Sequence, residues 1–196
     1  MKNLSKHFTA ITGGKNTLRP ILTGIHYNHK TDELEATDSH RLLTFKAHYQ
    51  LTESFILNVN TLERIEGEYP NVERLIPNKH DTYLTASDLN PTLLKVIAAY
   101  KKELIQLTYS DAHLTIAQEN GNLITNIPLH NFKDADSNEP MYMNGQYFYD
   151  ALAFLLEYTK ICKNAEIHFT YVSRVRPVSF STVDFTYLIT PVRRNN

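Results

Sequence analysis

Residues Ala36–Leu42 read ATDSHRL, and the far end of the chain carries a short echo of them in Tyr187–Arg193, which reads YLITPVR. Each stretch holds one arginine among apolar and β-branched residues, a pattern typical of the edge of a β-strand. Neither stretch is a catalytic signature by its chemistry alone. What the two stretches do depends on how the rest of the chain folds around them.

The composition is that of an ordinary globular protein, with 196 residues of which 42% are hydrophobic and 21% charged, enough for one large or two small domains. The formal net charge of −1 provides no overall basic field, so any contact with DNA must come from a local patch. The single cysteine, Cys162, excludes an intramolecular disulfide and a Cys-rich zinc site and fits a reducing compartment. The sequence shows no signal peptide and no long apolar span, so we expect a cytoplasmic protein without a membrane partner.

The first half is predicted to begin with a short helix over residues 3–11, followed by β-strands. The strand candidates are residues 21–27, 33–36, 42–49 and 54–59. Asn60 is expected to cap a short helix over residues 61–65. Two prolines make residues 67–77 an extended connection, and we expect the domains to comprise residues 1–79 and 80–196.

The second half shows a repeat: a strand, a helix and three further strands, twice in succession. In the first copy the predicted elements are the strand 82–86, a helix from Pro91 to about Lys102, and the strands 104–109, 114–118 and 123–129. In the second copy they are the strand 141–143, the helix 146–159 and the strands 167–171, 178–182 and 187–192. Asn120-Gly121 is a strong signal for a tight hairpin, and residues 132–140 form an acidic linker. We therefore predict an α+β fold with helices on one face of antiparallel sheets.

Lysines gather on the predicted helices. Lys95 and Lys102 share one face of the 91–102 helix, with two alanines between them, which suits a helix that crosses a phosphate backbone without reading bases. The full set of candidate DNA-facing residues is Lys6, Arg19, Lys95, Lys102, Lys160 and Lys163. The alternative is an ordinary solvated helix face, and Asp150 and Glu157 on the last helix favour that alternative.

A search for catalytic chemistry finds little. His26, His29, Asp32, Asp38 and His40 include metal-ligand types, but positions 26 and 29 of a strand point to opposite faces. Asp38-Ser39-His40 contains the residue types of a hydrolase triad, yet the G-x-S-x-G nucleophile turn is missing. We therefore expect no catalytic residue, no metal and no cofactor, with a small metal-dependent nuclease as a minor alternative.

Four blocks of the sequence, in the same order, resemble the bacterial DNA polymerase III β subunit, the sliding clamp family. The blocks are Arg19–Gly24, Ala36–Leu42, the segment from Gly67 to Pro77, and the set formed by 144–152, 176–178 and 187–193. The resemblance implies a non-enzymatic processivity factor that encircles double-stranded DNA, independently of sequence, as a homo-oligomeric ring. It also implies that a polymerase, and a clamp loader, dock short peptide motifs into one groove.

Carried over residue by residue, the groove has three groups of residues. The first half contributes Leu22, Thr37, Ser39, His40, Arg41 and Leu42. The connector contributes Pro70, Arg74 and Leu75. The second half contributes Asn144, Tyr147, Val178, Leu188, Ile189, Thr190, Pro191, Val192 and Arg193. The alternative for Leu22, Leu42 and Ile189 is plain core packing.

The chain departs from the family pattern in two ways. The family's first domain is absent, and the second repeat of the N-terminal half is reduced, because the stretch between Arg64 and Glu68 leaves no room for the expected strands. Three copies would restore a six-domain ring, so a trimer is favoured over a dimer. A compact clamp of this size suits a phage genome. The alternative is a clamp-derived module that docks replisome peptides without encircling DNA.

Overall fold

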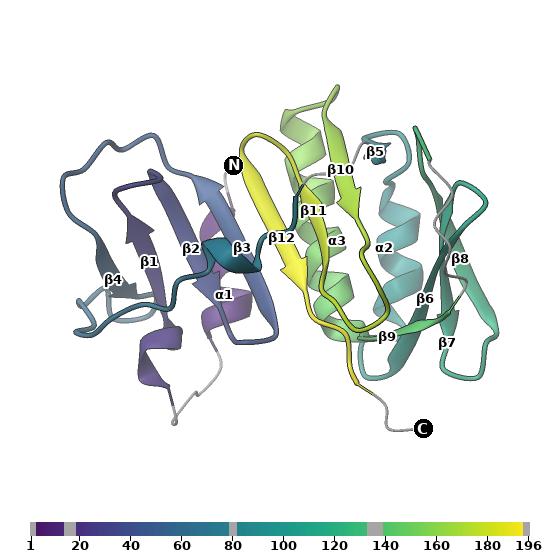
Figure 1. Ribbon diagram of the computed structural model, residues 1–196, viewed down its shortest axis with the longest axis horizontal. Coiled ribbons are helices and arrows are strands. Elements are labelled where there is room, and N and C mark those ends of the chain that lie inside the picture. Colours follow the sequence, from purple (N-terminus) through teal and green to yellow (C-terminus); the bar gives the residue numbers. More distant parts are fainter. Residues whose placement is uncertain (1–2, 14–18, 79–81, 133–138, 194–196) are drawn as a thin grey trace. The chain divides into compact units, whose positions relative to one another are not determined.

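The computed structural model describes residues 3–13, 19–78, 82–132 and 139–193 (Figure 1). The chain divides into a small unit, Lys2–Pro77 with Val183–Leu188, and a large unit, Asn78–Thr182 with Ile189–Asn196. The expected boundary at residues 79 and 80 lies outside the described residues. A piece from near the C-terminus thus belongs to the small unit, which no local pattern in the sequence indicates.

The small unit is a sheet with one helix on one face. Its elements are α1 (Leu4–Thr12), the 3-10 turns η1 (Pro20–Thr23) and η2 (Glu73–Leu75), and the strands β1 (Gly24–Asn28), β2 (Glu33–Thr37), β3 (Arg41–Lys46) and β4 (Phe55–Asn58). The strands lie in the order β4-β1-β2-β3, and the pairs β4–β1, β1–β2 and β2–β3 are antiparallel. The backbone N–H of Lys46 donates to the carbonyl of Asp184 at 2.8 Å, which joins the C-terminal piece to β3.

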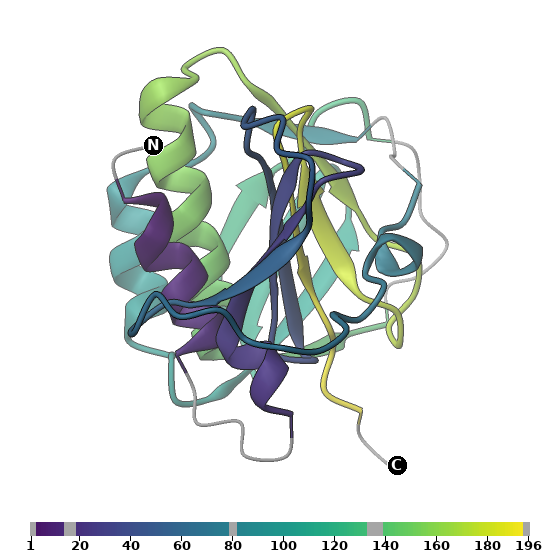
Figure 2. The ribbon, with the colours of Figure 1, turned by 90° about the vertical axis from the view of Figure 1, so that its left-hand side faces the viewer.

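The two faces of this sheet are covered differently. Viewed from the side of the small unit, α1 lies along one face and the segment that carries η2 lies along the other (Figure 2). On the helix, Phe8 and Ile11 are buried at 1% and 3% exposure. A second buried cluster consists of Leu22, Leu42, Ile56, Tyr69, Val72 and Leu188. Tyr69 and Val72 of the extended segment 67–77 belong to this second cluster.

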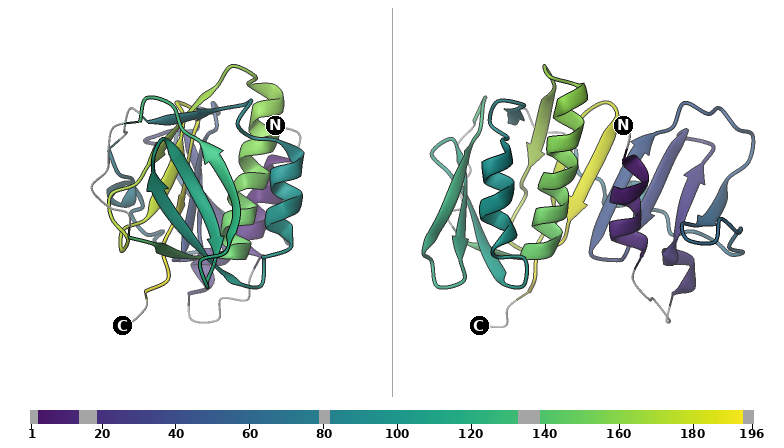
Figure 3. Two further views of the ribbon diagram at one scale, coloured as in Figure 1. Left: turned by 90° about the vertical axis from the view of Figure 1, so that its right-hand side faces the viewer. Right: turned by 180° about the vertical axis from the view of Figure 1, so that it is seen from behind.

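The predicted repeat of a strand, a helix and three strands is confirmed, and all of its elements except the last strand lie in the large unit. Its elements are β5 (Tyr83–Thr85), α2 (Pro91–Ala98), β6 (Leu104–Ser110), β7 (His113–Gln118), β8 (Leu123–Pro128), β9 (Met141–Asn144), α3 (Gly145–Ile161), β10 (Glu166–Thr170) and β11 (Val178–Ser181). One sheet has the order β8-β7-β6-β9, and β10 pairs antiparallel with both β5 and β11. The last strand of the second repeat is β12 (Phe185–Ile189). Figure 3 shows α2 and α3 side by side on the same side of these strands.

Apolar periodicity explains the helices of the large unit. Along α3, the side chains of Phe148, Leu152, Phe154 and Leu155 are fully buried, at 0% exposure. The hairpin predicted at Asn120-Gly121 is also present: the N–H of Gly121 donates to Gln118 at 2.9 Å, and Gly121 adopts φ 87°. Among the described residues, none of the helices is long and apolar enough to cross a lipid bilayer.

Several boundaries differ from the sequence prediction. The helix expected over residues 61–65 is wrong: the side chain of Asn58 accepts from the N–H groups of Asn60 and Thr61 and forms a turn, and Leu62 takes φ 60°. The backbone N–H of Ile65 then donates a hydrogen bond to the carbonyl of Ile56 on β4.

The strand expected from residue 21 begins only at Gly24, because Pro20 opens the turn η1. Likewise α2 ends at Ala98 and not near residue 102, and β12 lies earlier than the predicted 187–192.

Candidate functional site

The turn between β2 and β3 is organised by the carboxylate of Asp38. Its Oδ1 accepts hydrogen bonds from the backbone N–H groups of His40 at 2.9 Å and Arg41 at 2.7 Å. Ser39 adopts φ 76°, and its N–H donates to the hydroxyl of Thr37 at 3.2 Å. Asp38 therefore plays the role that short acidic side chains commonly play in turns, that of an acceptor for nearby backbone groups.

Arg41 connects this turn to α1. Its Nε donates to Oδ2 of Asp38 at 2.9 Å, and its Nη2 donates to the carbonyl of Ala10 on α1, also at 2.9 Å. The side chain is only 6% exposed. Arg41 is one of the predicted groove residues, and this assignment stays a prediction; its guanidinium has partners within the chain, and the neighbouring Ser39 and His40 are exposed.

The apolar groove candidates of the small unit lie in its interior. Leu22, Leu42 and Leu188 are 2%, 1% and 2% exposed and share the cluster that contains Tyr69. Thr37 is buried as well, and its backbone N–H donates to the Tyr69 hydroxyl at 3.0 Å. The three leucines therefore belong to the hydrophobic core of the small unit. Burial is the main cause that raises the pKa of Tyr69 far above its usual value.

The connector candidates are on the surface. Pro70 and Arg74 are exposed, and Leu75 is half exposed at 50%. The groove role of these three residues stays a prediction, and their exposure is compatible with it.

The candidates in the large unit divide in the same way. Asn144 caps α3, because its side-chain oxygen accepts from the N–H groups of Gln146 at 2.9 Å and Tyr147 at 3.2 Å. Val178 and Ile189 are buried at 1% and 0% exposure. The remaining candidates are at least partly accessible: Tyr147, Thr190 and Pro191 are intermediate, and Val192 and Arg193 are exposed.

The six candidate DNA-facing cations are all exposed. Lys6 is on α1, Arg19 precedes η1, Lys95 is on α2, Lys102 follows α2, Lys160 is in the last turn of α3, and Lys163 follows it. A cation in the last turn of a helix also interacts favourably with the helix dipole. Their exposure is compatible with the predicted contact with a phosphate backbone, which stays a prediction.

The histidines and carboxylates considered as metal ligands have separate partners. His26 bonds Glu35 at 2.7 Å, His29 bonds Ser54 at 2.8 Å, and Asp32 accepts from the hydroxyl of Tyr27 at 2.8 Å. Within residues 3–13, 19–78, 82–132 and 139–193, no group of three or more His, Cys, Asp or Glu side chains could hold a metal ion.

Sequence reasoning did not single out Glu35 and Tyr69, which organise the face of the small unit opposite α1. Glu35 is buried at 4% exposure and receives hydrogen bonds from His26 and from Asn28. The Tyr69 ring stacks on the imidazole of His26 with centroids 4.6 Å apart. The alternation of β2 places Glu35 and Thr37 on the same face, and this was the available signal.

Helix-backed antiparallel sheets, built from a repeated strand–helix–three-strand unit, define the fold of the DNA polymerase sliding clamps. The Bacillus subtilis clamp structure matches 98% of this chain with a TM-score of 0.70 and 20% sequence identity, and 63% of that structure is covered. A clamp structure from Pseudomonas aeruginosa matches 97% of the chain with a TM-score of 0.65, 15% identity and 64% of that structure covered.

The sequence comparison agrees with the fold. The chain is 24% identical to the β sliding clamp of Streptococcus pneumoniae over 95% of this chain and 61% of the relative. It is 28% identical to that of Lactococcus lactis over 90% of this chain and 58% of the relative. No protein-family model matches. The resemblance to bacterial β clamps is therefore confirmed, and the chain spans about three fifths of the length of these relatives.

The pneumococcal alignment also shows a difference in length. It extends over 236 residues, more than the 196 residues of the whole chain, so the relative carries segments that this chain lacks. The described part of the small unit contains a single α-helix, α1, where the large unit contains α2 and α3.

Proposed function

We propose that the chain is a DNA polymerase processivity factor that encircles duplex DNA as a homo-oligomeric ring and acts without catalysis. The observation that carries this proposal is the sliding-clamp fold, which extends over 98% of the chain. The exposed lysines of α2 and α3 would contact phosphates without reading bases, and such binding weakens steeply with salt.

The decisive experiment combines a mass measurement with a topological test on DNA. Sedimentation equilibrium at micromolar concentration is expected to give three times the chain mass of 22.6 kDa. The ring should stay on closed circular DNA, if necessary after assisted loading, and slide off the same DNA once it is linearised. A stable monomer would exclude a closed ring.

The lysines can be tested separately. Lys95→Glu combined with Lys102→Glu should reduce retention on circular DNA, because two phosphate contacts become repulsive. Lys30→Glu, a charge reversal at an exposed position in the turn between β1 and β2, is the matched control. Equal behaviour of the double variant and the control would remove Lys95 and Lys102 from the DNA face.

We further propose that partners, first of all a polymerase, bind through short peptide motifs at the predicted groove residues. The accessible candidates His40, Leu75, Val192 and Arg193 are the ones for which substitution tests recognition. We expect His40→Ala with Arg193→Ala to weaken binding of a polymerase peptide that carries the motif and to leave the solution mass unchanged. Arg41 is unsuited to this test, because its guanidinium connects the β2–β3 turn to α1.

A second candidate function is a clamp-derived module that occupies partner peptides without encircling DNA. The single α-helix in the described part of the small unit favours it. This candidate predicts a monomer that still binds the polymerase peptide, so the mass measurement and the peptide titration together separate the two functions.

A further inference from the structure

The small unit contains a cleft of about 150 Å³ on the face that Tyr69 covers. It lies between the start of β4, at Ser54–Ile56, and the segment 64–67, which pairs with β4 at its beginning and then departs from it. Ligand pockets for nucleotides or drug-sized molecules usually measure about 300–1,000 Å³. A cleft of this size accommodates one long side chain.

One wall of the cleft is an imidazole in a fixed orientation. His26 stacks on Tyr69, and its Nδ1 lies 2.7 Å from Oε2 of Glu35. Asn28 donates to the other carboxylate oxygen at 3.0 Å, so both oxygens of this buried group are used. Because a carboxylate only accepts hydrogen bonds, the proton of this contact is on Nδ1 of His26.

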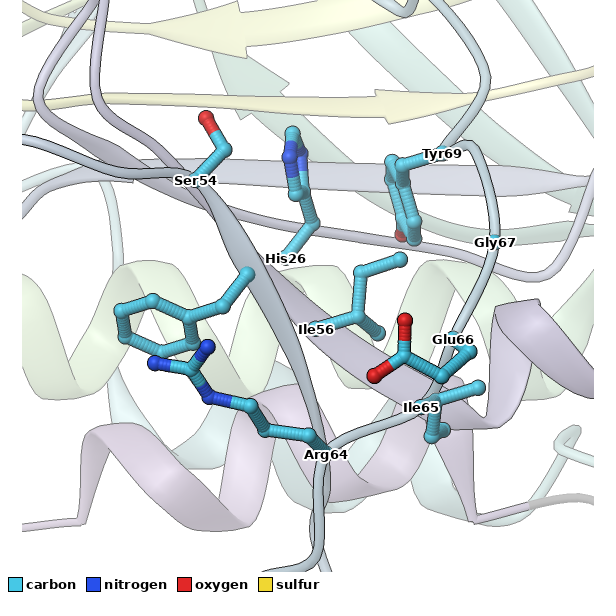
Figure 4. Close-up of a pocket in the computed structure, with 9 residues that line it drawn as sticks. His26, Ser54, Ile56, Arg64, Ile65, Glu66, Gly67 and Tyr69 are labelled. Atoms are coloured by element: carbon cyan, nitrogen blue, oxygen red, sulfur yellow. The ribbon is translucent and has the colours of Figure 1, made fainter.

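The charges at the rim have one predominant sign. Glu66 lines the cleft, and the exposed residues Glu63 and Glu68 flank it along the same segment. Arg64, the one arginine or lysine of the lining, lies over the ring of Phe55, with its guanidinium carbon 5.4 Å from the ring centroid. In the view of Figure 4 the Arg64 guanidinium and the Glu66 carboxylate lie on opposite sides of Ile56. The Glu66 carboxylate and the aromatic side chains of the lining together form an environment for a cation that donates hydrogen bonds.

We propose that this cleft binds a single arginine or lysine side chain from a peptide segment of a partner protein. Arginine is favoured, because its planar guanidinium stacks on rings and donates in several directions at once. The contact between Arg64 and Phe55 shows that this wall already accommodates a guanidinium. The site is separate from the predicted groove residues and goes beyond the proposed processivity function, since it involves neither DNA nor ring closure.

The test is an NMR titration of the full, isotope-labelled chain with N-acetyl-arginine amide. The expected result is a set of shift changes at His26, Ile56 and Ile65, saturating with a Kd of the order of 1 mM, as a single side chain in a small site permits. N-acetyl-citrulline amide, which has the same shape without the charge, should bind at least roughly tenfold more weakly. Equal binding of the two amides would overturn the proposal.

Substitutions of exposed residues show where the arginine amide binds and are not expected to unfold the protein. Glu66→Gln should weaken binding of the arginine amide by roughly two- to fivefold, whereas Glu68→Gln, two residues away and outside the lining, should change it little. Arg64→Gln should strengthen binding. If Glu66→Gln and Glu68→Gln weaken binding of the arginine amide equally, the effect is a general electrostatic attraction to the surface, and the assignment to the cleft is wrong.

The source of the cation is tested with two further probes. The peptide acetyl-Gly-Arg-Gly-amide should bind at least as well as the single amide, because the guanidinium enters the cleft from an extended backbone. Spermidine should bind more weakly than the peptide at matched ionic strength. Tighter binding of spermidine would overturn the assignment to a protein side chain.

Discussion

The two units of this chain are stabilised in different ways. In the large unit, the buried polar side chains of the described residues are only threonines and serines, and α3 packs through fully buried aromatic and leucine side chains. In the small unit, two charged side chains, Glu35 and Arg41, are buried at 4% and 6% exposure. The small unit has one α-helix in its described part and uses specific polar contacts where the large unit uses apolar packing.

This difference has a consequence for how each unit responds to substitution. Apolar packing is spread over many contacts, and the stability lost on substitution depends on the side-chain volume that is removed. A buried ion pair depends on the partner, because removal of one member leaves the other without compensation. The small unit should therefore be more sensitive to single polar substitutions than the large unit.

The largest expected effect is that of Arg41→Ala. The change removes the donors to Asp38 and to the Ala10 carbonyl, and about 3 kcal/mol of stability of the small unit should be lost. This is the low end for breaking a buried ion pair, because the Asp38 side chain is 20% exposed. Hydrogen exchange read separately for the two units is the measurement.

Arg74→Ala is the matched control for Arg41→Ala, since Arg74 is an exposed arginine of the same unit. This variant should change the free energy of unfolding of the small unit, measured by hydrogen exchange, by less than about 0.5 kcal/mol. If the two arginine variants behave alike, the view that polar contacts hold the small unit together is wrong.

The next largest effect is expected in the large unit, from Gly145→Ala at the start of α3. A Cβ atom at this position would meet the carbonyl oxygens of Tyr100 and Glu103, so the helix must shift, at a cost of about 2 kcal/mol. Gly121→Ala is the control, because no atom lies within 4 Å of its Cβ position and only its φ of 87° is unfavourable, worth roughly 1 kcal/mol. If Gly121→Ala lowers the stability of the large unit more than Gly145→Ala does, α3 is not closely packed at its start.

The large unit is also the part of the fold that its sequence predicts best. Its helices and strands alternate with regular apolar spacing, and Asn120-Gly121 and Asn90-Pro91 mark a turn and a helix start, all of which the structure contains. The small unit is less predictable, because its sheet receives residues 183–188 from the other end of the chain. Pairing between such distant segments leaves no mark in local periodicity.

The candidate site shows the same limit. The sequence predicts Arg41 as a groove residue, but it does not indicate that the Arg41 guanidinium donates to the carbonyl of Ala10, thirty-one residues earlier. The cleft beside Tyr69 was not predicted either, since it depends on the stacking of His26 on a ring forty-three positions later in the chain. Residue type and spacing indicate which groups are capable of recognition, and tertiary contacts decide which of them are free to perform it.

A smaller effect is expected from the caps of the two helices in the large unit. Asn144→Ala should lower the free energy of unfolding by about 1 kcal/mol, and Asn90→Ala should lower it less. The reason is that Asn144 accepts hydrogen bonds from two backbone N–H groups and Asn90 from one. Thermal unfolding of the two variants gives the comparison. Asn144→Asp keeps the acceptor and should retain most of the stability; a loss as large as that of Asn144→Ala would contradict the capping role.

The smallest effect concerns acid. Burial raises the pKa of Asp88, but hydrogen bonds from Thr85 and His130 outweigh it, so this pKa lies below its usual value. In the small unit, the pKa of Asp32 is lowered in the same way, because bonds from Tyr27 and two backbone N–H groups outweigh burial.

A lowered folded-state pKa means that each carboxylate stabilises its unit fully above the pKa of the unfolded chain, about 3.9 for aspartate. That stabilisation is lost as the pH falls through the lower folded-state value, so the contribution is constant from pH 7 to about pH 5 and declines below about pH 4. Asp88→Asn should flatten the acid dependence of hydrogen exchange in the large unit only, and Asp32→Asn in the small unit only. The control is Asp111→Asn, which removes an exposed carboxylate from a turn. If Asp88→Asn alters both units equally, their stabilities are coupled and the contrast between them does not extend to acid unfolding.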